Sequence, residues 1–145
     1  MTTVLAATDG SPNASAALHW AAEYARRNHA TLRVIHVWHY PYGASEAGAM
    51  MSPPESVFEE GARAIVDQAI AALDTHGLTV EKALRQGGAA QALLEEAKNA
   101  DVLVVGGRGH GGFAGLILGS VATHCTRHAQ IPTVVVPASS NEERE

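Results

Sequence analysis

The chain has little of several features that would define its class. It contains a single cysteine, Cys125, which excludes an internal disulfide framework and suits a reducing compartment. No apolar run approaches the length that crosses a membrane, and the first residues carry no basic segment of the kind that directs secretion. We therefore expect a cytoplasmic protein that does not associate with a membrane.

Positive charge is also scarce. Ten lysines and arginines face fifteen aspartates and glutamates, for a net charge of −5, and no basic patch interrupts the sequence. Nucleic-acid binding needs a basic face that neutralises phosphates, so this class of partner is not expected. The 145 residues, 46% of them hydrophobic, are enough for one domain with a real core. We expect that domain over residues 1–138 and a polar C-terminal tail over 139–145.

Strand-like and helix-like segments alternate along the chain. Short apolar runs, typical of strands buried on both faces, recur between amphipathic helical segments, which is the pattern of βαβ units. The pattern predicts a single-domain α/β fold with an open, doubly wound, five-stranded parallel sheet, Rossmann-like, in strand order 3-2-1-4-5, with helices on both faces. The expected strands cover residues 4–7, 32–38, 79–85, 102–105 and 133–136; the expected helices cover 12–28, 55–75 (stopped by Gly77), about 90–97, and 120–128.

Two segments outside this alternation carry expectations of their own. The segment from His39 to Pro54 is rich in proline, glycine and small residues, and we interpret it as a long surface loop. The last strand, Thr133 to Val136, lies between Pro132 and Pro137, which confine it to a sheet edge. A short apolar edge invites a symmetric partner, so we expect a homodimer through this strand.

The most informative stretch runs from Val102 to Val121, where an apolar strand leads into a glycine-rich loop and then a helix. Glycines allow positive φ and close approach of a ligand, with N–H groups free to donate to an anion. Ser120 begins the helix, so its hydroxyl, its N–H and the helix dipole favour a phosphate. No Walker A lysine is present, and Arg108 is the only fixed cation inside the loop. The glycines are Gly106, Gly107, Gly109, Gly111, Gly112, Gly115 and Gly119.

Asp9 follows the first apolar strand and precedes Gly10. Ligands of open parallel sheets bind beyond the carboxyl ends of the strands where the winding reverses, and strands one and four are neighbours there. A carboxylate at that point accepts hydrogen bonds from ribose hydroxyls or holds Mg²⁺ through water. A turn role for Asp9 and a merely flexible glycine loop are the structural alternatives. Glycine alone leaves phosphate, flavin and dinucleotide open as ligands.

Histidines give a weaker signal. His124 and His128 lie four residues apart on a predicted helix with Cys125 between them, a spacing that metal ligands also use. No third ligand follows nearby, and Cys125 fits the inward stripe of the helix, so we do not predict a metal site there. We interpret His36 and His39 as packing and loop residues. No paired-carboxylate pattern or Ser-His-Asp order indicates acid-base or nucleophilic catalysis.

The spacing of the glycines resembles a known signature. Gly106-x-x-Gly109, nine residues, then Gly119-Ser120 is similar to the nucleotide-binding pattern of the universal stress protein family. The opening VLAATDGSPNASAALHWA and the closing VVGGRGHGGFAGLILGSVATHCTRHAQIPTVVVP also resemble that family, so the likeness covers nearly the whole chain.

The resemblance implies an ATP site. It assigns the phosphates to Gly106, Gly109, Gly119 and Ser120, the ribose and a bound Mg²⁺ to Asp9, and the adenine to the backbone of Val37. The chain departs from the family at Gly107, where serine is frequent, and at His110, where arginine is frequent. Both departures leave the backbone cradle intact and change only how side chains supplement it.

These features favour a nucleotide-dependent stress-response regulator that binds ATP with little or no hydrolysis, and whose occupancy alters its conformation or its association with another protein. A slow ATPase or adenylate-transferring enzyme on the same site is the first alternative. The sequence shows no evident base to position water and no equivalent of the P-loop lysine, which argues against it. The second alternative is a dimeric scaffold that ignores nucleotides, as in the branch of the family without the loop, and the retained glycines argue against that.

Overall fold

The structure is a computed structural model that describes residues 2–40, 53–108 and 119–137. In the described residues five strands form one parallel sheet in the order β3-β2-β1-β4-β5, so the predicted order and the edge positions of β3 and β5 are confirmed. The expected tail over 139–145 and positions 41–52 of the expected loop lie outside these residues. The strands are β1 (Thr3–Ala7), β2 (Thr31–Trp38), β3 (Thr79–Gln86), β4 (Val102–Gly106) and β5 (Thr133–Val136).

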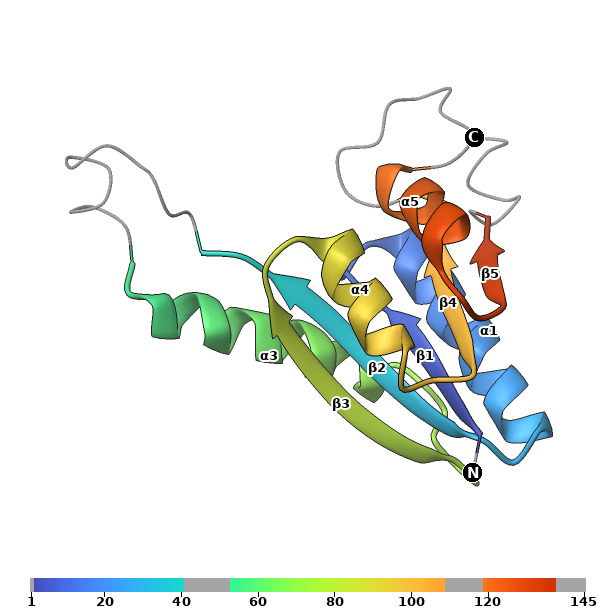
Figure 1. Cartoon of the computed structure of the whole chain (residues 1–145). Helices are drawn as coiled ribbons and strands as arrows, with labels where there is room; N and C mark the ends of the chain where they lie inside the picture. The colour runs from blue at the N-terminus through green and yellow to red at the C-terminus, as the bar shows by residue number, and fades with distance from the viewer. Residues whose placement is uncertain (1, 41–52, 109–118, 138–145) are drawn as a thin grey trace, which may run out of the picture.

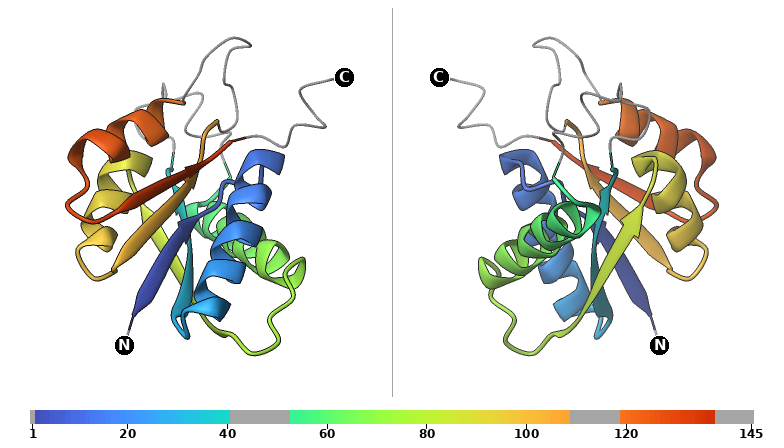
Figure 2. Two further views of the ribbon diagram at one scale, coloured as in Figure 1. Left: turned by 90° about the vertical axis from the view of Figure 1, so that its right-hand side faces the viewer. Right: turned by 90° about the vertical axis from the view of Figure 1, so that its left-hand side faces the viewer.

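Helices cover both faces of the sheet. Helices α1 (Pro12–Arg27) and α3 (Glu55–Ala71) pack on one face, and α4 (Ala89–Ala97) and α5 (Ser120–His128) pack on the other (Figures 1 and 2). Each face has its own buried apolar cluster, and the central strands contribute alternate residues to the two clusters. The predicted doubly wound fold is confirmed. No helix in the described ranges has the length and apolar character that a membrane span requires.

The register of the strands shapes the edge where they end. The last paired residues of β1 and β2 are Ala7 and Ile35, and β2 continues past this pair to Trp38. On the other side of β1, Ala6 pairs with Val104 of β4. The central strand therefore stops short of β2, and we refer to the offset beyond Ala7, beside residues 36–38 of β2, as the recess at the carboxyl edge of the sheet. All five arrowheads point toward this edge in Figure 1.

Helix α1 begins as its sequence predicts. Ser11 is the N-cap, its Oγ accepts a hydrogen bond from the N–H of Ala14 at 3.2 Å, and Pro12 occupies the first helical position. The buried stripe consists mostly of alanine, which brings the helix axis close to the sheet. A closely packed α1 sets the position of the β1–α1 turn, and with it Asp9.

Helix α3 ends at Ala71 instead of the predicted Thr75, and Gly77 is not its stop. The Asp74 carboxylate accepts a hydrogen bond from the N–H of His76 at 3.0 Å, and this local turn competes with continued helix. Gly77 lies beyond that turn with φ +73°, where a glycine is favoured. The periodic apolar pattern runs past the end of the helix because the buried Leu73 lies in the turn itself.

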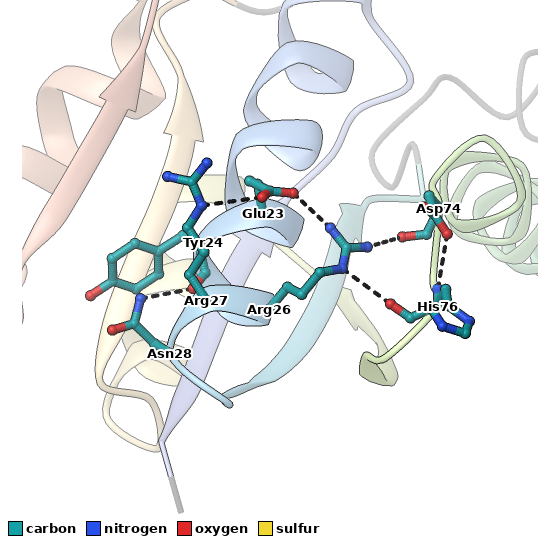
Figure 3. A network of polar contacts seen from close by, with 7 residues as sticks. All are labelled: Glu23, Tyr24, Arg26, Arg27, Asn28, Asp74 and His76. Carbon is teal, nitrogen blue, oxygen red and sulfur yellow. Dashed lines mark hydrogen bonds and ion pairs between the residues drawn. The ribbon is translucent and has the colours of Figure 1, made fainter.

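Arg26 ties this turn to α1, as Figure 3 shows. Its guanidinium donates to the carbonyl oxygens of Asp74 at 2.5 Å and His76 at 3.1 Å, and to the Glu23 carboxylate at 2.7 Å. One side chain thus satisfies two backbone acceptors of the turn that leads into β3. The contact lies at the end of the sheet opposite Gly106 and Gly107 and supports the fold there.

Candidate functional site

Asp9 lies in a tight turn at the carboxyl end of β1. Its Oδ1 accepts a hydrogen bond from the N–H of Ser11 at 2.9 Å, and Gly10 between them has φ +82°. The carboxylate is half-buried, so part of it reaches the surface. The turn role considered from the sequence is therefore real. That role also holds the carboxylate beside the recess above β1.

The backbone of Val37 faces the same recess. The carbonyl of Ile35 accepts from the N–H of Thr8 at 2.9 Å on the β1 side, and the carbonyl of Trp38 accepts from Gly87 at 2.8 Å on the other side. Backbone groups alternate between the two sides of a strand, so the N–H and C=O of Val37 point toward β1, beyond its last paired residue. A donor and an acceptor therefore stand side by side at the edge of the recess.

A pocket of about 630 Å³ opens between the end of β2 and the first turns of α3. Its walls are mainly apolar, with Phe58 and Ile65 from α3, and His36 and His39 among the residues from β2 and the segment after it. A Cβ built on Gly10 would lie 3.6 Å from Cγ2 of Ile65, so the pocket adjoins the β1 turn. The sequence did not indicate this pocket, because the segments that form it are distant in the chain.

His36 has a more specific environment than the predicted packing role. It is 9% exposed, lines the pocket, and its Nδ1 lies 2.7 Å from the carbonyl oxygen of Thr8. The alternation of side chains along β2 gave one signal, since His36 and Val37 must face opposite sides of the sheet. The sequence does not reveal the register between β1 and β2, which places the end of β1 beside this side chain.

The two described ends of the glycine loop are joined by backbone hydrogen bonds. The N–H of Gly107 donates to the carbonyl of Val136 at 2.9 Å, and the N–H of Gly119 donates to the carbonyl of Gly107 at 2.5 Å. These two N–H groups are therefore occupied, which corrects the expectation that they are free for an anion. Gly109 and the other glycines between these ends lie outside the described residues.

Positive φ is not the reason for glycine at the described positions of this loop. The described glycines with positive φ are Gly10, Gly77 and Gly87, and Gly119 has φ −69°. The expectation of left-handed backbone is thus wrong for Gly106, Gly107 and Gly119. The sequence-based argument confused the freedom that glycine permits with the conformation that it adopts.

Gly106 has a packing reason of its own. It is the last residue of β4, and a Cβ there would lie 3.0 Å from the carbonyl oxygen and 3.2 Å from the carbonyl carbon of Asn13 in the first turn of α1. Such distances are tighter than nine in ten real Cβ contacts, so the backbone at Asn13 would have to move by a few tenths of an ångström. Glycine at this position lets α1 approach the end of β4, whether or not a ligand binds nearby.

Among the described residues, the first N–H groups of α5 have no side-chain cap. Gly119 is its N-cap and makes no side-chain capping bond, and the first intrahelical bond runs from the N–H of Thr123 to Gly119 at 3.0 Å. The N–H groups of Ser120, Val121 and Ala122 precede that bond, as at any helix start. Ser120 is exposed beside them. Val121 joins the predicted Ser120 as a donor that the sequence could have indicated from the helix start alone.

Arg108 and the histidines and cysteine of α5 are the other candidate residues in the described part of the chain. Arg108 is half-buried directly after Gly107. The rings of His124 and His128 lie 4.6 Å apart on α5, while Cys125 is fully buried as predicted, and burial raises the pKa of its thiol. Within residues 2–40, 53–108 and 119–137, no three side chains of histidine, cysteine, aspartate or glutamate gather in a way that could hold a metal ion.

Comparison with known proteins agrees with this fold. The model of the universal stress protein family matches residues 1–137. A curated universal stress protein from Mycolicibacterium smegmatis is 34% identical over 138 residues, which cover 92% of this chain and 47% of the relative. The chain spans about half the length of the curated relatives it matches.

Two solved structures illustrate the likeness in three dimensions. Universal stress protein UspA from Lactobacillus plantarum has a TM-score of 0.72 at 21% identity, with 93% of this chain and 97% of that chain covered. A universal stress protein described as in complex with cAMP has a TM-score of 0.64 at 28% identity, with 95% and 98% covered.

Proposed function

The chain belongs to the universal stress protein family, as its glycine spacing predicted, and from that premise we propose that the carboxyl edge of its sheet binds ATP with Mg²⁺. One observation carries the proposal. The start of α5, which has no side-chain cap, the carboxylate of Asp9 and the backbone of Val37, which points toward β1, lie along one edge across three neighbouring strands. Donors for phosphate, an acceptor for ribose and a donor–acceptor pair for a base stand there in the order in which a nucleotide presents these groups.

The spacing of the strands suits such a ligand. Strand β1 separates β2 from β4, so the base and phosphate ends of the site are about 10 Å apart, two strand spacings of about 4.8 Å each. The base lies against Val37 at the end of β2, and the ribose lies over Asp9 at the end of β1. The phosphates reach the segment after β4, where Gly106, Gly109, Gly119 and Ser120 form the family pattern.

Charge at the phosphate end comes from three sources. The N–H groups of Ser120 and Val121 and the dipole of α5 favour an anion. The guanidinium of Arg108 adds a fixed positive charge two residues after Gly106. The Asp9 carboxylate would hold Mg²⁺ through water, since this ion keeps part of its water shell when it binds a protein, and the ion would offset part of the phosphate charge.

A regulatory role fits this site better than rapid catalysis. The loop has no lysine comparable to that of a P-loop, and such a cation normally stabilises charge on the transferred phosphoryl group. The cAMP described for the related structure supports an adenine nucleotide as the ligand class. We therefore expect a cytoplasmic regulator with little or no hydrolysis, in which nucleotide occupancy stabilises one conformation.

A second copy of the chain is the expected partner. Strand β5 pairs with β4 on one side only in the described sheet, and all four of its residues are half-buried. An apolar edge of this kind pairs readily with an identical edge. Sedimentation velocity at micromolar protein, with and without Mg-ATP, tests this expectation, and a monomer under both conditions contradicts it.

Ser120→Asp tests the phosphate end of the site. A carboxylate in the first turn suits the dipole of α5 and supports the fold by about 0.3–1 kcal/mol, while it repels phosphate. The matched control is Ala89→Asp, the same negative charge at the first position of α4, whose N-cap Gly88 also lacks a side-chain bond. Calorimetric titration with Mg-ATP should show a large loss of affinity in the first variant and near-native affinity in the second.

The outcomes separate the hypotheses. No bound nucleotide after purification and no titration of the native chain would remove the proposal. Equal losses of affinity in both variants would mean that the effect comes from the change in net charge and not from the position of the carboxylate. Phosphate release followed over hours decides between regulator and enzyme, because many turnovers that Ser120→Asp abolishes would favour the ATPase.

A further inference from the structure

The hydrogen bond from His36 to Thr8 determines which nitrogen of its ring carries hydrogen. A backbone carbonyl oxygen only accepts, so the Nδ1 atom, 2.7 Å from that oxygen, must be the donor. In the neutral ring the Nε2 atom is then an acceptor with a lone pair. The backbone of β1 therefore selects the tautomer and the orientation of the ring.

The Nε2 atom opens onto the pocket between β2 and α3. Throughout the described parts of the chain, no fully buried side-chain nitrogen or oxygen lacks a hydrogen-bond partner, and the partner of His36 is at Nδ1. Since the residue is 9% exposed and lines the pocket, the accessible part of its ring faces that space. An acceptor in a mainly apolar wall is costly to cover unless a ligand supplies a donor.

We propose that His36 is a specificity-determining residue, which accepts a hydrogen bond at Nε2 from the exocyclic amino group of the bound base. The inference rests on the proposed nucleotide site. It places the base against two consecutive residues of β2, with the Val37 backbone in the plane of the sheet and the His36 ring on the α3 face. The apolar side chains of Phe58 and Ile65 then cover a flat aromatic ring.

The chemistry of the acceptor predicts the preferred base. Adenine carries an amino group at its six position and meets Nε2 with a donor. Hypoxanthine and guanine carry a carbonyl at that position, so two acceptors would oppose each other in a desolvated wall. A site that hydrogen-bonds one group of its ligand discriminates strongly against an analogue without it.

The test compares ATP with inosine triphosphate in three proteins. The native chain should bind ATP about tenfold or more tightly, the effect of one buried hydrogen bond lost and an acceptor left unpaired. His36→Asn keeps an amide N–H for the Thr8 carbonyl and loses Nε2, so the preference should fall severalfold, and the preference that remains is due to the Val37 backbone. The control is His19→Asn on α1, whose Nδ1 also lies 2.8 Å from a backbone carbonyl, that of Ser15, but which is exposed outside this pocket and should keep the native preference.

Each outcome has a distinct meaning. Tight binding of both nucleotides by the native chain, or an undiminished preference in His36→Asn, overturns the role of His36 and leaves the nucleotide site standing. Failure of the native chain to bind either nucleotide overturns both. A readout without substitution is the nitrogen NMR resonance of Nε2, which should move on addition of ATP and stay in place with inosine triphosphate.

Discussion

Gly106→Ala should destabilise the free protein, in contrast to the same change one residue later. The added methyl group would lie 3.0 Å from the carbonyl oxygen of Asn13 and 3.2 Å from its carbonyl carbon. These atoms are backbone in the first turn of α1, so no side chain can swing away to make room. Either β4 or α1 must shift by a few tenths of an ångström.

The cost follows from forced overpacking in a close-packed interface. Insertions of this kind typically cost about 1–3 kcal/mol, which corresponds to about 2–10 °C in Tm for a domain of this size. Helix α1 follows the Asp9 turn directly and has Ser11 as its N-cap. A shift of α1 would therefore carry the strain into the candidate site. The loss appears without nucleotide, because the methyl group points at α1.

Gly107→Ala is the matched control. Its Cβ would lie 3.6 Å from Cγ1 of Val135 and 3.6 Å from the carbonyl oxygen of Val136, both ordinary van der Waals distances. Its φ is not positive, so alanine fits the backbone, and a less flexible unfolded chain gives a gain of about 0.4–1 kcal/mol. Gly106→Ala shares this gain, so the two variants should differ by about 1–3 kcal/mol, the cost of overpacking alone.

Urea denaturation of both variants, followed by circular dichroism, measures this difference. The midpoint should fall in Gly106→Ala and hold or rise in Gly107→Ala, with an unchanged dependence of the free energy on urea in both. Equal stabilities would refute the packing reason for Gly106. An identical loss in both would point instead to glycine flexibility as the shared requirement.

Three further changes test other contacts of the fold. Ser11→Ala removes the cap of α1 and should lower the unfolding free energy by about 1 kcal/mol in urea titrations; no loss would mean that Pro12 alone sets the helix start. Arg26→Met keeps the apolar stem but loses the bonds to the turn after α3, and should lower Tm by several degrees, about 1–2 kcal/mol; an unchanged melt would show that the turn holds itself. Burial raises the pKa of the Cys125 thiol, so it should react with a disulfide reagent only as fast as the chain unfolds. Stability should also fall as pH rises past the ordinary thiol pKa, because the unfolded chain ionises first; fast native labelling would contradict the burial.

The periodicity of apolar residues predicted most of the fold. The bounds of α5 and β5 agree with prediction to the residue, because a serine, a histidine and two prolines mark changes in pattern there. The end of α3 was missed since apolar spacing continues into a turn set by the Asp74 side chain. Capping residues therefore predict where a helix starts, but apolar spacing does not show where a local turn ends the helix early.

The same distinction between local patterns and long-range contacts applies to the residues of the candidate site. Asp9 and Ser120 were predicted because each follows or begins an element with a recognisable pattern, and Val37 was predicted from the family resemblance. His36 and the partners of Gly106 and Gly107 were not, because their roles depend on register and on contacts between distant segments. Where β1 ends relative to β2 decides whether a histidine on β2 faces packed backbone or a pocket, and no local pattern encodes that offset.

The two helices that follow β1 and β4 explain where along the edge an anion should bind. Both begin at the carboxyl side of the sheet and so direct a positive dipole end toward it. The start of α1 is already satisfied by the Ser11 hydroxyl, whereas α5 begins at Gly119 without a side-chain cap. In the proposed site, phosphate would therefore favour the start of α5, and the base would lie away from it across β1. The unequal capping of two similar helices is thus the physical reason for the orientation that we propose for the nucleotide.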